Sequence, residues 1–163
     1  MLFRSQAGVS PVWRDCGFGV ATAERECLDV MGSRELAIRL VQAPRLLPGE
    51  RQVFGFSQID TVTGNGTLAT VFADRVAAAA ERNHVNGPTL LGRTVAHEIG
   101  HLLLGTTAHT PTGLMRELWA DPLLRRRTSL DEWRFTEPEA TLIRGGLRAR
   151  VSDTPARIAL HDK

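Results

Sequence analysis

The segment that most constrains the fold runs from Thr89 to Leu104. Its apolar residues recur with the three- and four-residue spacing of a helix that packs on a core: Leu90, Leu91, Val95, Ala96, Ile99, Leu102, Leu103 and Leu104. Pro88 and Thr89 are typical of a helix start, where a threonine hydroxyl caps free backbone N–H groups. Gly105 is typical of a helix end, because glycine adopts the left-handed conformation without strain. We therefore predict a largely buried helix that ends at Leu104.

This predicted helix carries His97, Glu98 and His101. The two histidines lie one turn apart, so both imidazoles point to the same side and can bind one metal ion. Glu98 lies beside them, where a carboxylate can take a proton from a water molecule that the metal activates. His109 follows the glycine end of the helix, and catalytic zinc usually has three protein ligands. We predict one Zn²⁺ ion bound by His97, His101 and His109.

Sequence alone leaves alternatives open for each of these residues. Histidines at this spacing also occur by chance on metal-free helices, although buried imidazoles need polar partners. A glutamate from a later helix is an alternative third ligand, as in thermolysin-like enzymes: Glu132, Glu137 or Glu139. Thr136 and Glu139, however, also have the spacing of a capping box, which gives Glu139 a structural role. His84 is typical of a histidine in a solvent-exposed loop.

The order of these features resembles the metzincin clan of zinc endopeptidases. Gly105, the third histidine and the segment Thr112–Met115 are similar to the clan's glycine turn and methionine turn. More specifically, the chain resembles small bacterial metzincin-like proteins with HEIGHLLLG, a histidine, and then GLM or GIM. The resemblance implies three zinc-binding histidines, Glu98 as general base, and Met115 beneath the metal. The chain departs from the usual pattern, because three residues rather than two precede Gly105 and three more precede His109.

The resemblance covers about residues 9–150 and implies an α+β fold within a single domain spanning 1–163. An upper subdomain, at about 9–104, would hold a mixed β-sheet and the motif-bearing helix. A lower subdomain, at about 105–150, would hold the methionine turn and a final helix, before a loose tail at 151–163. In the clan an antiparallel edge strand pairs with extended substrate. By order along the chain this edge is Val53–Ser57, with Phe54, Gly55, Phe56 and Ser57 as substrate-binding residues.

Hydrophobic patterns predict the other elements. Alternation predicts three strands: Glu35–Ala43, Val53–Ile59 and Thr67–Ala73. In the first strand the alternating apolar residues are Leu36, Ile38 and Leu40. The Asn-Gly pair within Thr61–Gly66 predicts a turn. Helices are expected at Asp74–Arg82 and from the capping box onward through Ile143. Nearer the N-terminus we predict the end of a helix at 1–7, a strand at 11–16 and a short helix at 21–28.

The composition is that of a globular protein, with 42% hydrophobic and 23% charged residues over 163 positions. A net charge of +2 does not indicate a nucleic-acid partner. No segment approaches the ~20 apolar residues of a membrane span. The cluster at 125–127 holds three arginines and is expected on an exposed loop. We expect a monomer that acts on a peptide or protein, with no nucleic-acid partner and no membrane span.

The cysteines Cys16 and Cys27 bear on the compartment. A disulfide between them would indicate an oxidising compartment, but two free thiols fit the sequence equally well. No signal peptide is visible. Metzincins usually begin with a strand and a full helix, of which only the helix end is visible. We therefore hypothesise a shortened N-terminus with an export signal upstream, which would favour an extracytoplasmic location.

These observations favour a zinc-dependent endopeptidase. Two alternatives remain at this stage. One is a zinc-binding interaction module with little turnover, in which the motif mainly holds the fold together. The other is a zinc hydrolase that acts on a non-peptide amide.

Overall fold

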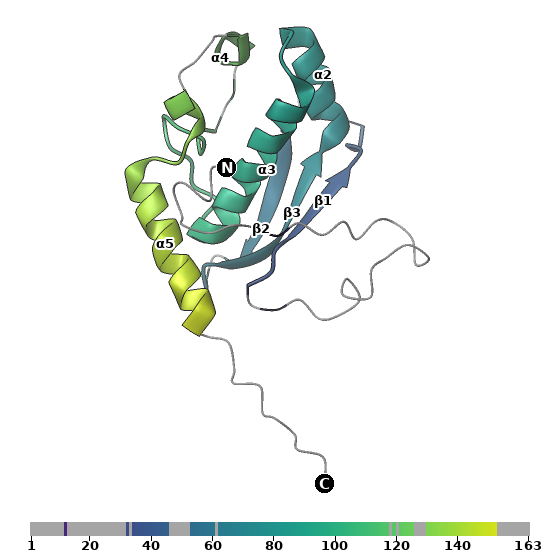
Figure 1. Cartoon of the computed structure of the whole chain (residues 1–163). Coiled ribbons are helices and arrows are strands. Elements are labelled where there is room, and N and C mark those ends of the chain that lie inside the picture. The colour runs from purple at the N-terminus through teal and green to yellow at the C-terminus, as the bar shows by residue number, and fades with distance from the viewer. Residues whose placement is uncertain are drawn as a thin grey trace.

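The computed structural model describes residues 12, 32, 34–45, 53–60, 62–117, 119, 121–125 and 130–152. Within these ranges the fold is α+β, as predicted, with a three-stranded mixed sheet and four α-helices (Figure 1). The predicted elements at 1–7, 11–16 and 21–28 lie outside the described residues. The same holds for both cysteines, for residues 126 and 127, and for the tail beyond 152.

The sheet has the strand order β1-β3-β2. Strand β1 (Ala37–Val41) runs parallel to β3 (Asn65–Phe72), and β2 (Gly55–Asp60) runs antiparallel to β3. Among the described strands, β2 is therefore an antiparallel edge strand. Paired residues share a face of the sheet, so Ser57 lies with Ala69 on one face, and Phe56 with Thr70 on the other.

The β2–β3 turn differs from the prediction. Asn65 already belongs to β3 and pairs with Asp60, so the turn itself is Val62–Gly64. Gly64 has a φ of +66°, and the Asp60 carboxylate accepts the backbone N–H groups of Val62 and Thr63. These hydrogen bonds lower the pKa of the exposed Asp60 carboxyl. The turn is thus closed by an aspartate before it rather than by the Asn-Gly pair.

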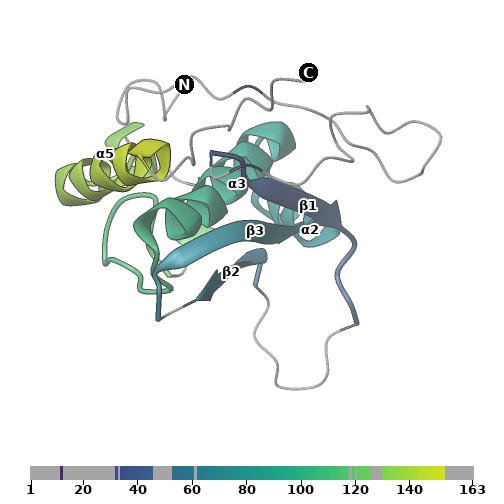
Figure 2. The same cartoon turned by 90° about the horizontal axis from the view of Figure 1, so that it is seen from below.

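Four α-helices complete the described fold: α2 (Ala73–Asn83), α3 (Gly87–Leu104), α4 (Asp121–Arg125) and α5 (Glu137–Ser152). A short 3₁₀ helix covers Leu130–Trp133. Helix α3 contacts β2, β3, α2 and α5, which places it at the centre of the molecule. Helices α2 and α3 lie on the same face of the sheet (Figure 2), and α5 lies alongside α3 (Figure 1).

The predicted motif-bearing helix is present, but its start differs from the prediction. Asn86, rather than Thr89, is the N-cap, because its side chain accepts the backbone N–H of Thr89 at 2.8 Å. Thr89 is already in the first helical turn, and its hydroxyl donates to the same Asn86 oxygen. The end is as predicted: Gly105 has a φ of +65°, and its N–H binds the His101 carbonyl. A Cβ at Gly105 would also collide with the Gly64 carbonyl oxygen.

The core lies between α3 and the elements that pack around it, which include β3, α2 and α5. Its most deeply buried side chains come from every layer: Val71, Val76, Leu90, Leu102, Leu114, Met115 and Ile143. Leu36 and Ile38 pack against this core, whereas Leu40 is 46% exposed. Among the described strands, β1 lies at an edge of the sheet, where it contacts β3 and α2.

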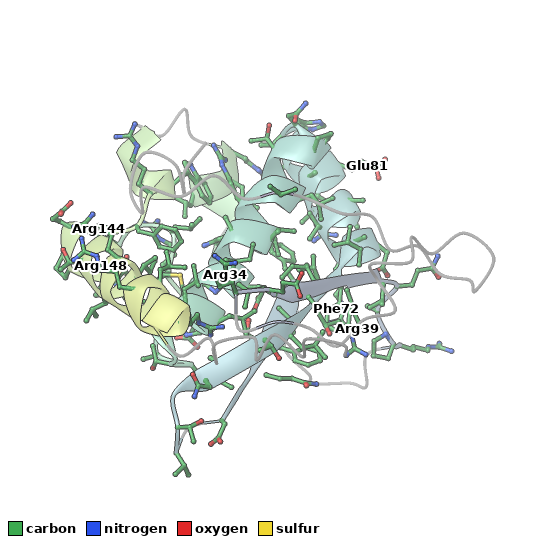
Figure 3. All side chains as sticks on the ribbon, turned by 60° about the horizontal axis from the view of Figure 1, so that its bottom comes forward. Arg34, Arg39, Phe72, Glu81, Arg144 and Arg148 are labelled. Atoms are coloured by element: carbon green, nitrogen blue, oxygen red, sulfur yellow. The ribbon has the colours of Figure 1, made fainter. Side chains whose placement is uncertain are left out.

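The other face of the sheet carries Arg39, Thr70 and Phe72. Arg39 donates a hydrogen bond to the Thr70 hydroxyl, and the Phe56 ring lies 6.0 Å from that of Phe72. Arg39 and Phe72 are labelled in Figure 3 near this part of the sheet. Gln58 belongs to the same face, because it pairs with Leu68. This face points away from α3.

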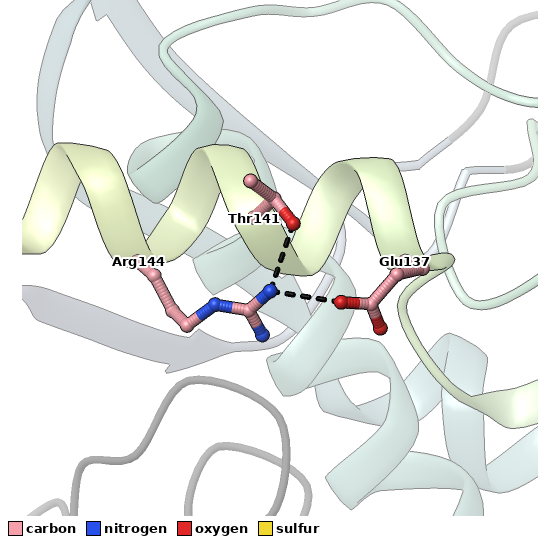
Figure 4. A network of polar contacts seen from close by, with 3 residues as sticks. All are labelled: Glu137, Thr141 and Arg144. Atoms are coloured by element: carbon pink, nitrogen blue, oxygen red, sulfur yellow. Dashed lines mark hydrogen bonds and ion pairs between the residues drawn. The ribbon is translucent and has the colours of Figure 1, made fainter.

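Helix α5 begins with one of the two hydrogen bonds that the capping-box pattern predicts. The Glu139 carboxylate accepts the backbone N–H of Thr136 at 2.6 Å, and the Ala140 N–H binds the Thr136 carbonyl. One turn later, Arg144 bonds to Glu137 and Thr141 on the exposed side of the helix (Figure 4). Such exposed pairs contribute at most ~1 kcal/mol.

Within the described ranges, no helix combines the length and the apolar character needed to cross a membrane.

Candidate metal centre

The three predicted ligands His97, His101 and His109 come together in the structure. The Nε2 atoms of His97 and His101 are 3.1 Å apart, and those of His101 and His109 are 3.2 Å apart. All three ligand atoms lie within 4.8 Å of one another. His97 and His101 are buried on α3, whereas His109 lies on the exposed loop after Gly105. His84 is exposed and ends α2 in a left-handed conformation, apart from this group.

The hydrogen bonds of two rings fix which nitrogen carries the hydrogen. The Nδ1 of His97 lies 2.8 Å from the Leu114 carbonyl oxygen, and the Nδ1 of His101 lies 2.8 Å from that of Thr106. Because a carbonyl oxygen only accepts, each Nδ1 must donate. In the neutral ring, Nε2 then has a lone pair and no hydrogen. Two bare lone pairs therefore face each other across 3.1 Å.

Protonation does not resolve this close approach at neutral pH. Burial lowers the pKa of His97 to about 4, against a smaller opposing effect of its bond to Leu114. Burial also lowers the pKa of His101, again partly offset by its backbone bond to Thr106. Both rings are thus neutral at pH 7, and the facing lone pairs repel unless a cation lies between them. The donor set fits a metal ion.

The spacing of the nitrogens agrees with this assignment. Tetrahedral bonds of ~2.0–2.1 Å to zinc place ligand nitrogens about 3.3 Å apart. The Nε2 atom of His101 lies 3.1 Å from that of His97 and 3.2 Å from that of His109, both close to that value. Metal-binding histidines also usually donate their other N–H to a carbonyl or carboxylate, as His97 and His101 do here. Three imidazoles suit zinc, copper, iron or nickel, so the geometry supports a transition-metal site.

The two gaps before His109 are each one residue longer than in the usual pattern. One additional residue lies in α3, and the other lies in a loop that hydrogen bonds hold in place. Helix α3 extends three residues beyond His101 before Gly105 ends it. The Thr106 carbonyl then turns back to His101, and the Thr106 hydroxyl accepts the N–H of Ala108. The loop closes further along, where the Thr110 N–H binds the Met115 carbonyl. His109 therefore reaches the other histidines in spite of the two longer gaps.

The glutamates considered as alternative ligands are engaged elsewhere. Glu132 lies 3.8 Å from the Arg116 guanidinium, and Glu137 is paired with Arg144. Glu139 accepts the N–H of Thr136. Among the described residues, the metal-ligand group consists of the three histidines alone. A third ligand from a glutamate is therefore not supported.

Glu98 points from α3 toward β2 and is almost fully buried, with 4% of its surface exposed. Its Oε2 accepts a hydrogen bond from the Ser57 hydroxyl at 2.7 Å. Burial raises the pKa of the Glu98 carboxyl to about 7, and the bond from Ser57 partly counters that effect. A carboxyl group whose pKa lies near neutrality can both accept and return a proton.

Met115 is 1% exposed and packs beneath α3. Its sulfur atom lies where a side chain at Gly100 would be, so the helix can approach this methionine only at a glycine. The preceding residue, Leu114, supplies the carbonyl that orients His97. The segment Thr112–Met115 therefore supports the histidine-bearing helix from below.

The four residues predicted to bind substrate have three different surroundings. Gly55 and Ser57 face Glu98, as their contacts with its carboxylate show. Phe56 is 42% exposed on the opposite face of the sheet, and Phe54 packs against the core next to Trp119. Strand alternation places the side chain of Phe56 on the other face from those of Gly55 and Ser57, whereas Phe54 precedes β2.

Sequence patterns did not indicate the neighbours that surround the histidines. The ring of Trp119 stands edge-on to that of His97, with centroids 5.5 Å apart, and also contacts Phe54 and Trp133. Its indole nitrogen is buried without a hydrogen-bond partner in the described part of the chain. No local signal predicts this contact, because it joins two segments through tertiary packing.

Comparisons of the chain with protein-family models, with curated proteins and with solved structures found no match.

Proposed function

We propose that this protein is a zinc-dependent endopeptidase with a metzincin-like arrangement of its site. One observation carries the proposal: three imidazoles converge, and Glu98, the residue after His97 on α3, is a buried carboxylate that contacts the edge strand β2 of the described sheet. His97, His101 and His109 would hold the metal through their Nε2 atoms. When bound, zinc supplies a Lewis acid that polarises a carbonyl group and makes a water molecule more acidic.

Glu98 would act as the general base. Its carboxylate would take the proton of the attacking water and pass it to the leaving nitrogen of the cleaved amide. The burial of Glu98 supports this role, because it holds the carboxyl in a site with few competing water molecules. His97 and His101 would be oriented by the carbonyls of Leu114 and Thr106. Their burial, which lowers the pKa of both rings, would keep them neutral.

Strand β2 would bind the substrate. It is an edge strand in the described sheet and runs antiparallel to β3. An extended peptide can add to such an edge through main-chain hydrogen bonds, which give affinity for many sequences. Gly105 at the end of α3 and Met115 beneath it support the metzincin-like assignment. We also propose the metzincin-like division into an upper subdomain at about 9–104 and a lower subdomain at about 105–150.

Two measurements test this function. The purified protein should contain one zinc ion per chain and should degrade an unbiased peptide library. Glu98→Gln should abolish cleavage while the zinc content stays unchanged, because Glu98 is not a metal ligand. Exposed Glu81 is a matched control on α2, and Glu81→Gln should cleave at the wild-type rate. Zinc binding without any peptide cleavage by the wild type would contradict the proposal and favour a zinc-binding interaction module.

A further inference from the structure

We infer that Ser57 is a positioning residue for Glu98, and that it determines which carboxylate oxygen is left to transfer a proton. This inference deepens the proposed function and rests on it for its catalytic consequence. The contact itself is independent of any activity.

The Ser57 side chain links the edge strand to the motif-bearing helix. Its hydroxyl oxygen lies 2.7 Å from Glu98 Oε2 and 2.9 Å from the Glu98 backbone carbonyl oxygen. One hydroxyl hydrogen serves one of these acceptors at a time. An ionised carboxylate is the stronger acceptor, so the side-chain bond dominates when Glu98 is charged. Oε2 is thereby fixed to β2.

The other carboxylate oxygen lies over Gly55. A Cβ at this position would be 2.9 Å from Glu98 Oε1 and 2.6 Å from the Thr70 carbonyl oxygen. The absence of a side chain at Gly55 therefore leaves the space that the carboxylate occupies. Oε1 has no hydrogen-bond donor among the described residues, whereas Oε2 has Ser57. The geometry thus distinguishes a held oxygen, Oε2, from an available one, Oε1.

The position of Ser57 on β2 gives this contact a second consequence. The main chain of β2 is the edge to which substrate would add, and the side chain of Ser57 on the same strand holds the base. One strand would therefore align both the substrate and Glu98. Removing the hydroxyl would let the carboxylate rotate away. Losses of about 10- to 100-fold are typical when a catalytic group loses its orienting partner.

The first test measures the contact in metal-free protein at pH 8, by urea unfolding of a double-mutant cycle. Ser57→Ala should lower the unfolding midpoint in the wild-type background. In the Glu98→Ala background the same change should lower the midpoint clearly less, because the partner is already absent. Equal shifts in the two backgrounds would overturn the inference. Gln58→Ala, on the same strand but on the opposite face, should shift the midpoint equally in both backgrounds.

The second test measures peptide cleavage by the zinc-loaded protein. Ser57→Ala should lower kcat about 10- to 100-fold with little change in KM, and Ser57→Thr, which keeps the hydroxyl, should restore most of it. Glu81→Gln, on the exposed surface of α2, should cleave at the wild-type rate. A wild-type kcat for Ser57→Ala would overturn the inference. If the wild type cleaves nothing, the proposed function fails, and the double-mutant cycle alone decides whether Ser57 positions Glu98.

Discussion

The Thr110 hydroxyl donates a hydrogen bond to the Glu139 carboxylate at 2.9 Å, joining the loop that carries His109 to the first turn of α5. Glu139 is 6% exposed and also accepts the backbone N–H of Thr136. Glu139, which the sequence offered as a possible metal ligand, therefore binds Thr110, the residue next to the ligand His109. His109 is exposed, so its position depends on the loop more than on packing around its ring.

Thr110→Val should weaken metal binding without touching a ligand. Valine has nearly the shape of threonine, but it leaves the buried Glu139 oxygen without its hydroxyl donor. We expect a loss of about 1–3 kcal/mol in unfolding free energy and a roughly 10- to 100-fold weaker zinc affinity. Competition with a chelating dye measures the affinity. Thr107→Val, in an exposed position of the same loop, is the control. Equal affinities for the two variants would contradict the role of Thr110.

His109→Ala tests the third ligand directly. Removing one of three imidazoles should reduce zinc affinity by more than the roughly 10- to 100-fold expected for an outer contact. His84→Ala removes an exposed histidine that ends α2 and should leave zinc binding unchanged. Metal content after dialysis against a weak chelator distinguishes these outcomes. Zinc content equal to the wild type in the His109 variant would exclude His109 as a ligand.

The metal-free protein should show opposite pH dependences from two buried groups. Burial lowers the pKa of His97 from 6.5 to about 4, so the contribution of this group to stability is complete above pH 6.5 and is lost as the pH falls toward 4. Burial raises the pKa of Glu98 from 4.5 to about 7, so its contribution is complete below pH 4.5 and is lost as the pH rises through 7. Between pH 4.5 and 6.5, stability rises with pH because of His97 and falls with pH because of Glu98, so the two pH dependences largely cancel.

Glu98→Gln should remove one of these two effects. At pH 8 the metal-free variant should exceed the metal-free wild type by ~1–3 kcal/mol in unfolding free energy, because no buried carboxylate must ionise. Near pH 4 the two should be equally stable. Urea unfolding across this pH range is the measurement. A variant that is no more stable than the wild type at pH 8 would show that the Glu98 carboxyl has an ordinary pKa.

Two glycines of α3 should respond oppositely to alanine. A Cβ at Gly100 would overlap the Met115 sulfur and lie 2.7 Å from the Phe135 ring, whereas a Cβ at Gly92 meets nothing within 4 Å. Gly100→Ala should therefore cost about 1–3 kcal/mol through overpacking. Gly92→Ala should stabilise the protein by roughly 0.5–1 kcal/mol, because alanine loses less backbone entropy in a helix. Thermal unfolding of both variants checks the difference in sign.

The parts of the site that follow from local geometry could be predicted. His97 and His101 share a side of α3 because residues four apart in a helix always do. Gly105 ends that helix as expected, and Glu139 begins α5 with half of a capping box. Local patterns failed where two neighbouring polar residues competed for one role. Asn86 caps α3 in place of Thr89, and an aspartate closes the β2–β3 turn in place of the Asn-Gly pair.

The sequence by itself determined the helix and the side of it that carries two imidazoles, because these depend on residue spacing along one element. Only the tertiary structure brought His109 to the other two histidines, Ser57 to Glu98 and Thr110 to Glu139. The latter two contacts join residues 41 and 29 positions apart. Periodicity describes how a side chain lies relative to its own backbone, whereas contacts between separate elements depend on how those elements pack.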